Sequence, residues 1–274
     1  MDDKISAVVG KLQQRLGDDY EVRIVDVTKN NDTVKKGISV RKNGEKIGRI
    51  YYWNGEALEA FLGDVESSPL PDIDFEMSLK KQKDNIVAIL INAEANKERL
   101  KDMPHRMVEG LDLAVVYKIV FKKDSEGITS SDINNGMMAM LRVTEDELYT
   151  IAMNNTKEYY APDIKSMTET LNDMMKESQD IVEDIPETLF ILSNETRQFG
   201  AICMLYPEVL KKFCMETMID GVFVIPSSIH EVLLMIADKN KADIGYIKRM
   251  IKEVNNENVS EVERLSDSPY YYAE

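Results

Sequence analysis

The amino-acid sequence predicts an α+β protein, with an N-terminal helix plus a three-stranded antiparallel meander, followed by a larger mixed α+β domain. The hydrophobic pattern changes from a helical period to a period of two near Tyr20. Further along the chain, strand-like and helix-like segments come in blocks and do not alternate strictly. Sheets with helices segregated beside them are typical of the α+β class.

The first 66 residues are expected to form the helix and β-meander module. Apolar residues at helical spacing over 3–16 predict an amphipathic helix, which Gly17 ends. Two segments of alternating polarity, "YEVRIVDVTKNND" and "KKGISVRKNGEKIGRIYYWNG", predict the strands, and Asn43-Gly44 is a strong hairpin signal. A short helix is expected over 56–63, and "DVESSPLPDIDF" is the expected linker to the second domain, 76–274.

The first half of the second domain is expected to contain two strands and then helices. The β-branched content of 86–92 favours a strand, and the apolar segment 110–124 predicts a central strand that is buried on both faces. The next fifty residues are expected to be helical. They contain a capping box at Thr144 and Glu147 and an apolar helical face after Pro162.

The second half of this domain reads as strand, helix, a pair of strands and a closing helix. A strand is expected over 187–196, and a helix is expected to begin near Pro207, because proline suits the first helical turn. "GVFVIPSSIHEVLLMIAD" predicts two strands interrupted at Pro226. The segment 242–259 then predicts the last helix.

Composition excludes several classes of protein. With 274 residues, 43% of them hydrophobic, and no apolar stretch of about 18–20 residues, the chain is expected to be globular and not to enter a membrane. Its start lacks the features of a secretory signal, so we expect a cytoplasmic protein. The net charge of −15 disfavours nucleic acid as a partner, because that binding depends on Lys and Arg.

The polar segment "PSSIHE" between the last two expected strands contains the first candidate site residues. Ser227, Ser228, His230 and Glu231 are the residue types of nucleophilic catalysis, and a loop at the end of a sheet is a common place for function. Serine triads, however, assemble from distant positions, and no G-x-S-x-G elbow is present. We therefore expect these residues to act with others in a binding site, and no catalytic residue is assigned.

His105 and Arg106 are the second candidates. They precede the central strand in what reads as a loop that could reach the same sheet end as His230. The chain has two histidines and two cysteines and lacks an HExxH motif, so no metal site is expected. The glycines form no phosphate-binding loop, and no cofactor is expected.

Five blocks of the sequence, in this order, resemble an uncharacterised family of bacterial proteins, a domain of unknown function. The resemblance extends over 86–272 and rests on "LDLAVVY", "TEDELYTIAMNNT", "GAICMLYPEVLKKF", "PSSIHEV" and "EVNNENVSEVERLSDSPYYY". It supports the domain assignment and implies no activity. A fainter likeness to a second uncharacterised group implies that Asn154 or Asn155 lies near the proline-serine turn. Both asparagines are therefore candidate ligand-binding residues.

Three functions are compatible with the sequence, which leaves open whether the protein is an enzyme. The first is an acidic cytoplasmic protein that binds an unknown protein or small molecule without chemistry, since no complete catalytic constellation is present. The second is a small-molecule hydrolase or transferase in which the two candidate loops meet in one pocket. The third is an acidic nucleic-acid mimic, which requires its carboxylates to line one face.

Overall fold

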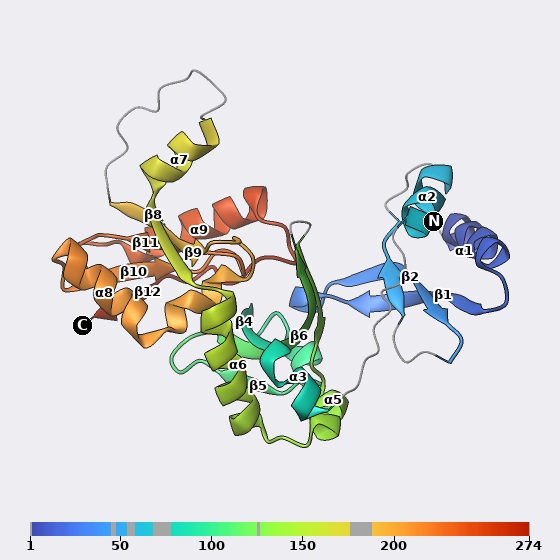
Figure 1. Ribbon diagram of the computed structural model, residues 1–274. Helices are drawn as coiled ribbons and strands as arrows, with labels where there is room; N and C mark the ends of the chain where they lie inside the picture. Colours follow the sequence, from blue (N-terminus) through green and yellow to red (C-terminus); the bar gives the residue numbers. More distant parts are fainter. Residues whose placement is uncertain are drawn as a thin grey trace. The chain divides into compact units, whose positions relative to one another are not determined.

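The computed structural model describes residues 2–44, 48–53, 58–67, 78–124, 127–175 and 188–273. The chain forms two compact units, Met1–Glu76 and Met77–Glu274, which are described separately. The first contains an N-terminal helix and a three-stranded antiparallel sheet, and the second is a mixed α+β unit (Figure 1). The predicted fold class is confirmed.

The first unit is a two-layer arrangement in which both long helices lie on one side of the sheet (Figure 1). The antiparallel strands have the order β1-β2-β3. The elements, in chain order, are α1 (Asp2–Leu16), β1 (Tyr20–Thr28), η1 (Asn30–Asp32), β2 (Val34–Lys42), β3 (Arg49–Tyr51) and α2 (Leu58–Ser67). The Asn43-Gly44 signal falls between β2 and β3, and Gly44 has a φ of +87°.

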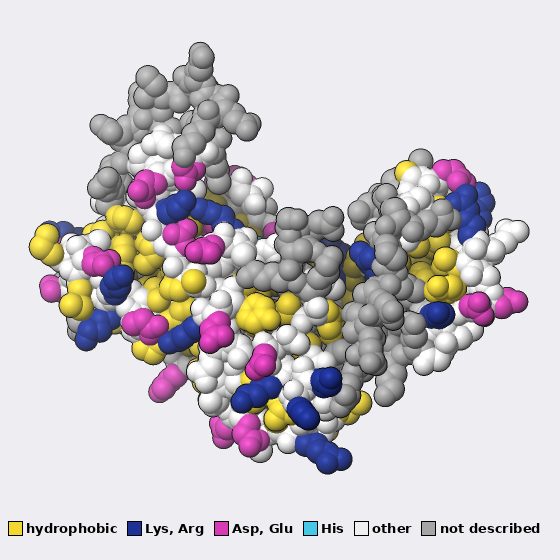
Figure 2. All heavy atoms as spheres, viewed as in Figure 1, with side chains coloured by type: hydrophobic (Ala, Val, Ile, Leu, Met, Phe, Trp, Pro, Cys, Tyr) yellow, Lys and Arg dark blue, Asp and Glu magenta, His cyan; other side chains and the backbone are white. Residues whose placement is uncertain are grey.

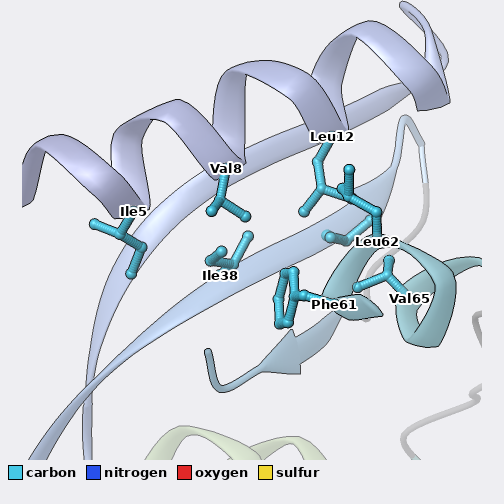
Figure 3. Packing of buried hydrophobic residues seen from close by; sticks show 8 residues of the cluster. Ile5, Val8, Leu12, Ile38, Phe61, Leu62 and Val65 are labelled. Carbon is cyan, nitrogen blue, oxygen red and sulfur yellow. The ribbon is translucent and has the colours of Figure 1, made fainter. Parts of the chain in front are cut away.

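The core of this unit forms where the apolar stripe of α1 meets the sheet and α2. Ile5, Val8 and Leu12 recur at helical spacing and are buried. Figure 3 shows them pointing from α1 toward Ile38 of β2. Phe61, Leu62 and Val65 of α2 complete the cluster. Full burial of one such side chain is worth about 1.5–3 kcal/mol, so this cluster is enough to hold two helices on a small sheet.

The segment that was expected to link the two domains lies largely outside the described residues. Its first residues, 64–67, belong to the last turn of α2. The described part of this helix, Leu58–Ser67, extends beyond the expected end at residue 63, and the expected start at residue 56 lies outside the described residues.

The second unit contains two antiparallel sheets. The first has the order β4-β6-β5, with β7 also paired to β6, and the second has the order β12-β10-β11-β9-β8. The strands are β4 (Ile86–Asn92), β5 (His105–Met107), β6 (Leu113–Asp124), β7 (Gly127–Asp132), β8 (Pro162–Ser166), β9 (Leu189–Asn194), β10 (Gly221–Ile225), β11 (Val232–Met235) and β12 (Tyr270–Ala273). The helices are α3 (Leu79–Gln82), η2 (Lys83–Asn85), α4 (Lys97–Leu100), α5 (Asn135–Leu141), α6 (Glu145–Tyr159), α7 (Met167–Met175), η3 (Gly200–Leu205), α8 (Pro207–Thr217) and α9 (Ile244–Asn258).

Strand β6 is the central strand of the first sheet, as predicted, and its residues 113–117 are all buried. Helix α6 packs on one face, where the Ala88 N–H donates to the Thr156 hydroxyl at 2.7 Å. The opposite face packs against Phe199. The predicted capping box is present at the start of α6: Glu147 N–H donates to the Thr144 hydroxyl, and the Glu147 carboxylate accepts from the Thr144 N–H.

Two expectations for this unit were wrong. Residues 125–175 are not wholly helical, because β7 and β8 lie within them, and the helix expected after Pro162 begins only at Met167. The segment at His105 is the short strand β5, paired with β6, and not a loop. In each case long-range pairing decides the conformation: Pro162–Ser166 pairs with Asn194–Phe190 of β9, against a local pattern that favours a helix.

Candidate functional site

The PSSIHE segment connects the antiparallel strands β10 and β11, as predicted. It is held along its length by residues 263–266, which lie between α9 and β12. The Leu265 N–H donates to the Ser227 carbonyl at 3.0 Å, and the Ile229 N–H donates to the Glu263 carbonyl at 2.8 Å. Ser228 forms an isolated antiparallel bridge with Arg264. The connection is therefore paired through its backbone with residues 263–266 and is not an open loop.

The Ser228 side chain forms a hydrogen bond within this connection. It is 8% exposed, and its hydroxyl accepts a hydrogen bond from the backbone N–H of His230 at 3.0 Å. It is the backbone of His230, and not the imidazole, that contacts the hydroxyl. Ser227 is half-buried, and its backbone N–H donates to the Ile225 carbonyl at 3.1 Å.

The His230 imidazole is held on both sides. Its Nδ1 accepts a hydrogen bond from the Phe199 backbone N–H at 3.2 Å, and its ring stacks on the Phe199 ring with centroids 5.7 Å apart. Since Nδ1 accepts, the ring hydrogen is on Nε2, which lies 3.6 Å from Glu263 Oε1. The side chain is 29% exposed, so the pair with Glu263 is accessible from solvent.

The turn that presents Phe199 has an unusual backbone. Arg197 and Phe199 have φ values of 51° and 55°, in the left-handed region that large side chains rarely adopt. Gly200 follows, and a Cβ there would lie 2.4 Å from Ser193 Oγ and 2.6 Å from the His230 carbonyl oxygen. The Ser193 hydroxyl donates to that carbonyl at 2.8 Å. Such strained turns are common at functional sites.

A group of ion pairs lies behind Phe199. Asp132 accepts from Arg99 at 2.5 Å and is 2.7 Å from the Lys118 ammonium, and both basic side chains are largely buried. The Lys118 Nζ is 5.5 Å from the centre of the Phe199 ring. Burial opposes ionisation of Asp132, but the positive charges of Lys118 and Arg99 outweigh it and hold its pKa below the usual value. The ion pair with Asp132 therefore holds Lys118 in place beside the Phe199 ring.

Glu231 lies at the end of the same connection. Its carboxylate is 3.9 Å from the Arg197 guanidinium, and both side chains are partly exposed. An exposed pair at this distance contributes little to stability. Glu231 and His230 therefore both face the turn at 197–199, but Glu231 does not contact the imidazole.

His105 and Arg106 point to opposite faces of the first sheet, because neighbouring residues of a strand alternate. His105 pairs across the sheet with Val116, on the face that packs against Phe199, and its Nδ1 is 2.8 Å from the Met103 carbonyl oxygen. Arg106 instead faces α6. The structure therefore separates this pair and does not bring Arg106 to the PSSIHE connection.

Arg106 joins strand β5 to the start of α6. Its guanidinium donates to Glu145 at 2.6 Å and to Asp146, and it lies 3.9 Å from the centre of the Tyr149 ring. The hydrogen bond to Glu145 raises the pKa of Arg106. The Tyr117 hydroxyl donates to the same carboxylate. Burial, and to a smaller extent this hydrogen bond, raises the pKa of Tyr117. This cluster ties the sheet to a helix.

The two candidate asparagines differ in their surroundings. Asn155 Nδ2 donates to the carbonyls of Lys83 and Ile86, at 2.7 and 2.8 Å, and so attaches α6 to the start of β4. Asn154 is exposed. Asn155 therefore has a role in packing, and Asn154 is the more exposed of the two.

Other kinds of site find little support in the described part of the chain. No three His, Cys, Asp or Glu residues come together there to bind a metal ion, and no described helix could cross a membrane. Cys203 and Cys214 are buried thiols that form no disulfide, and burial raises the pKa of the Cys203 thiol to about 12. A hollow of about 240 Å³ is lined by residues other than the candidates, namely Pro162, Ile164, Val209, Lys212, Phe213 and Glu216.

Charges of both signs are mixed on the face of the second unit that Figure 2 presents. Lys and Arg side chains there are interspersed with Asp and Glu. A nucleic-acid mimic would instead require a continuous acidic face.

The fold and the candidate site define an α+β protein with a partly exposed histidine on a hydrogen-bonded connection between two strands. The chain belongs to a family of unknown function, DUF5688, whose match covers residues 3–274. The family thus includes the N-terminal unit as well as the segment that carried the resemblance. Neither the curated proteins nor the solved structures gave a match to this chain.

Several residues of the site were not found by sequence reasoning. Ser193, Phe199 and Glu263 all contact His230, but they come, in that order, from the end of β9, the following turn and the segment after α9. No local pattern marks them, because their contact depends on how distant segments pair. The segment "SNETRQFG" has the composition of a turn, and this is the only signal that pointed there.

Proposed function

We propose that this protein acts by binding a protein or small-molecule partner in the cytoplasm, and that it carries out no chemistry of its own. The hydrogen bonding of Ser228 and His230 is the observation that carries this proposal. The hydroxyl accepts from the backbone of His230, and Nδ1 of the ring accepts from Phe199. A serine nucleophile needs a base within about 2.6–3.2 Å of its hydroxyl, and here neither group can serve the other.

Further support comes from the surroundings of the other candidates. Arg106 and Asn155 are engaged in joining helix α6 to the first sheet. Two buried thiols that form no disulfide suit a reducing compartment, which favours the cytoplasm. The side chains that stay accessible for a partner are those around the turn at 197–199, namely Arg197, His230, Glu231 and Glu263.

A screen for turnover tests this proposal. The purified full-length protein is assayed with chromogenic carboxyl esters, phosphate esters, amides and labelled oligonucleotides, beside the variant His230→Ala. We expect neither protein to exceed the rate of the buffer. Turnover by the wild-type protein that disappears in a correctly folded His230→Ala variant would show that the protein is an enzyme and would overturn the proposal.

The small-molecule hydrolase or transferase stays the second candidate because of one observation. Bulky residues in the left-handed region beside a partly exposed His–Glu pair are typical of functional sites. In such an enzyme, a substrate would have to displace the Phe199 N–H from Nδ1 before the imidazole could act as a base. The same screen detects this activity.

A further inference from the structure

We infer that the outer edge of strand β1 is a docking site for an extended acidic peptide segment of a partner protein, which pairs with Ile24 and Asp26 as an added strand. This inference goes beyond the proposed function, because it names a surface on the first unit and the chemistry of its partner. It does not depend on the absence of catalysis in the second unit.

The direction of the backbone groups of β1 follows from its neighbours. Strand β1 pairs with β2 along one edge, and no described residue forms a strand along the other. The N–H and C=O groups of one residue in a strand point to the same side, and the side alternates along the chain. Gln13 of α1 shows which residues face outward, since its side-chain amide accepts from the Val22 N–H at 3.1 Å and donates to the Tyr20 carbonyl at 2.7 Å.

Along this edge, Gln13 forms hydrogen bonds only with the outward backbone groups at the start, those of Tyr20 and Val22. By alternation, Ile24 and Asp26 also direct their N–H and C=O groups outward, and no hydrogen bond to these groups is found in the described part of the chain. The Ile24 side chain is 38% exposed, and Asp26 is exposed as well. Most proteins protect such an edge with a proline, a bulge or a covering loop, and β1 is a continuous strand of nine residues without proline.

The charges beside this edge select an acidic partner. Arg23 of β1 and Lys35 of β2 are exposed, and they alternate with the residues that face the helices, since Ile38 and Val40 of β2 are in the core. Arg23 is 60% exposed and lies 3.8 Å from Glu21, whose carboxylate is already 2.5 Å from Arg41. A strand added to β1 would place one side chain beside Arg23 and the next beside Ile24, on opposite faces. The matching segment therefore alternates acidic and apolar residues.

A second copy of the chain fits this edge less well. If two β1 strands paired through Ile24 and Asp26, each Ile24 would face the partner copy's Asp26 and each Arg23 the partner copy's Val27, so neither Arg23 nor Asp26 would have an opposite charge directly across from it. A nucleic acid also fits less well. A phosphate backbone has no alternating N–H and C=O groups to pair with Ile24 and Asp26, and Glu21 lies among the arginines.

Peptide binding to the full-length protein tests the inference. The probe is a fluorescein-labelled peptide of about eight residues that alternates valine and glutamate, and the control peptide alternates valine and lysine. We expect the glutamate peptide to bind at least about tenfold more tightly, and its affinity to fall as salt rises from about 0.05 to 0.5 M. On binding, amide exchange should slow at Ile24 and Asp26 and stay unchanged at Val22, whose N–H already has a partner.

Two variants separate backbone pairing from charge. Asp26→Pro removes an outward N–H from an edge strand, where proline is tolerated, while the matched Asp26→Ala keeps it. We expect the proline variant to lose peptide binding and the alanine variant to retain it. Arg23→Glu should reverse the preference between the two peptides. If Asp26→Pro does not fold, the glutamate peptide with N-methylated valines replaces it and should fail to bind wild type.

Several results would overturn the inference. These are equal binding of both peptides, binding that survives Asp26→Pro or N-methylation, and fast exchange at Ile24 in the saturated complex. Protection of Ile24 in the protein alone, together with a doubled mass in solution, would mean that a second copy occupies the edge. The turnover screen concerns His230 in the second unit, so the two experiments are independent. A failed peptide-binding test would leave the proposed function unchanged, and turnover in the screen would leave the inference about the β1 edge unchanged.

Discussion

The backbone N–H of Phe199 donates a hydrogen bond to Nδ1 of His230, at 3.2 Å and across 31 residues of sequence. The same two residues stack their rings. The backbone of Phe199 is in the left-handed region, with a φ of 55°, and both its N–H and its ring contact the imidazole. The orientation of the only histidine in the candidate loop is therefore set by a strained turn.

The first prediction concerns the tautomer of His230. Because Nδ1 accepts the Phe199 N–H, we expect the neutral ring to carry its hydrogen on Nε2, toward Glu263. Long-range ¹⁵N–¹H correlation spectra of labelled protein distinguish the two nitrogens. A hydrogen found on Nδ1 would mean that the contact with Phe199 is not present in solution.

The second prediction compares the neighbours Asn155 and Asn154. Asn155→Ala leaves the carbonyls of Lys83 and Ile86 without their partner, so we expect the free energy of unfolding to fall by about 1–3 kcal/mol. Asn154→Ala changes an exposed side chain and should stay within about 0.5 kcal/mol of wild type. Urea unfolding measures both. Equal effects of the two substitutions would contradict the packing role of Asn155.

The fold class, the capping box and the strands on either side of the PSSIHE segment could be predicted because their signals are local. Thr144 and Glu147, for example, are three residues apart and form their hydrogen bonds within one helical turn. Strand β8 could not be predicted in this way. It is held by pairing with β9, and its residues Pro162–Ser166 carry no strand pattern of their own.

The candidate site was predicted in part for the same reason. The position of Ser228 and His230 between two strands follows from the pattern of the sequence. What their polar atoms contact depends on Phe199 and on residues 263–266, which reach the connection only through the folding of the whole second unit. Residue types alone left both binding and catalysis open, and the hydrogen bonds show a packing role for Ser228.

A third prediction follows from Gly200. Gly200→Ala places a methyl group 2.4 Å from Ser193 Oγ and 2.6 Å from the His230 carbonyl oxygen, so β9 and the PSSIHE connection must separate. Overpacking of this kind costs about 1–3 kcal/mol, and we expect a lower Tm together with a changed ring environment at His230. Thermal unfolding and the histidine NMR signals report these effects. A variant with wild-type Tm would show that the close approach at Gly200 is not needed.

The fourth prediction concerns alkaline pH. The pKa values of four tyrosines of the second unit are raised, mainly by burial: Tyr117, Tyr160, Tyr206 and Tyr270. In the unfolded chain they ionise near pH 10, so above this pH the unfolded state releases protons that the folded state retains. Stability should therefore be complete below about pH 10 and fall as pH rises further.

Absorbance of tyrosinate and far-UV circular dichroism, recorded together, check this sign. We expect the ionisation of these tyrosines to coincide with the loss of secondary structure, and Tyr117→Phe to reduce the dependence on pH. Ionisation of all tyrosines near pH 10 in a protein that stays folded would contradict their burial.

The paired variants Ser228→Ala and Ser227→Ala test most directly the claim that the PSSIHE connection holds the fold and does no chemistry. Both the free energy of unfolding and turnover in the substrate screen are measured. Because the Ser228 hydroxyl accepts the His230 N–H in a buried place, its loss should cost about 1 kcal/mol, while Ser227→Ala should change stability by less than about 0.5 kcal/mol. No turnover should be found in either variant or in wild type. A wild-type activity that one of these substitutions abolishes, without any change in stability, would contradict the account.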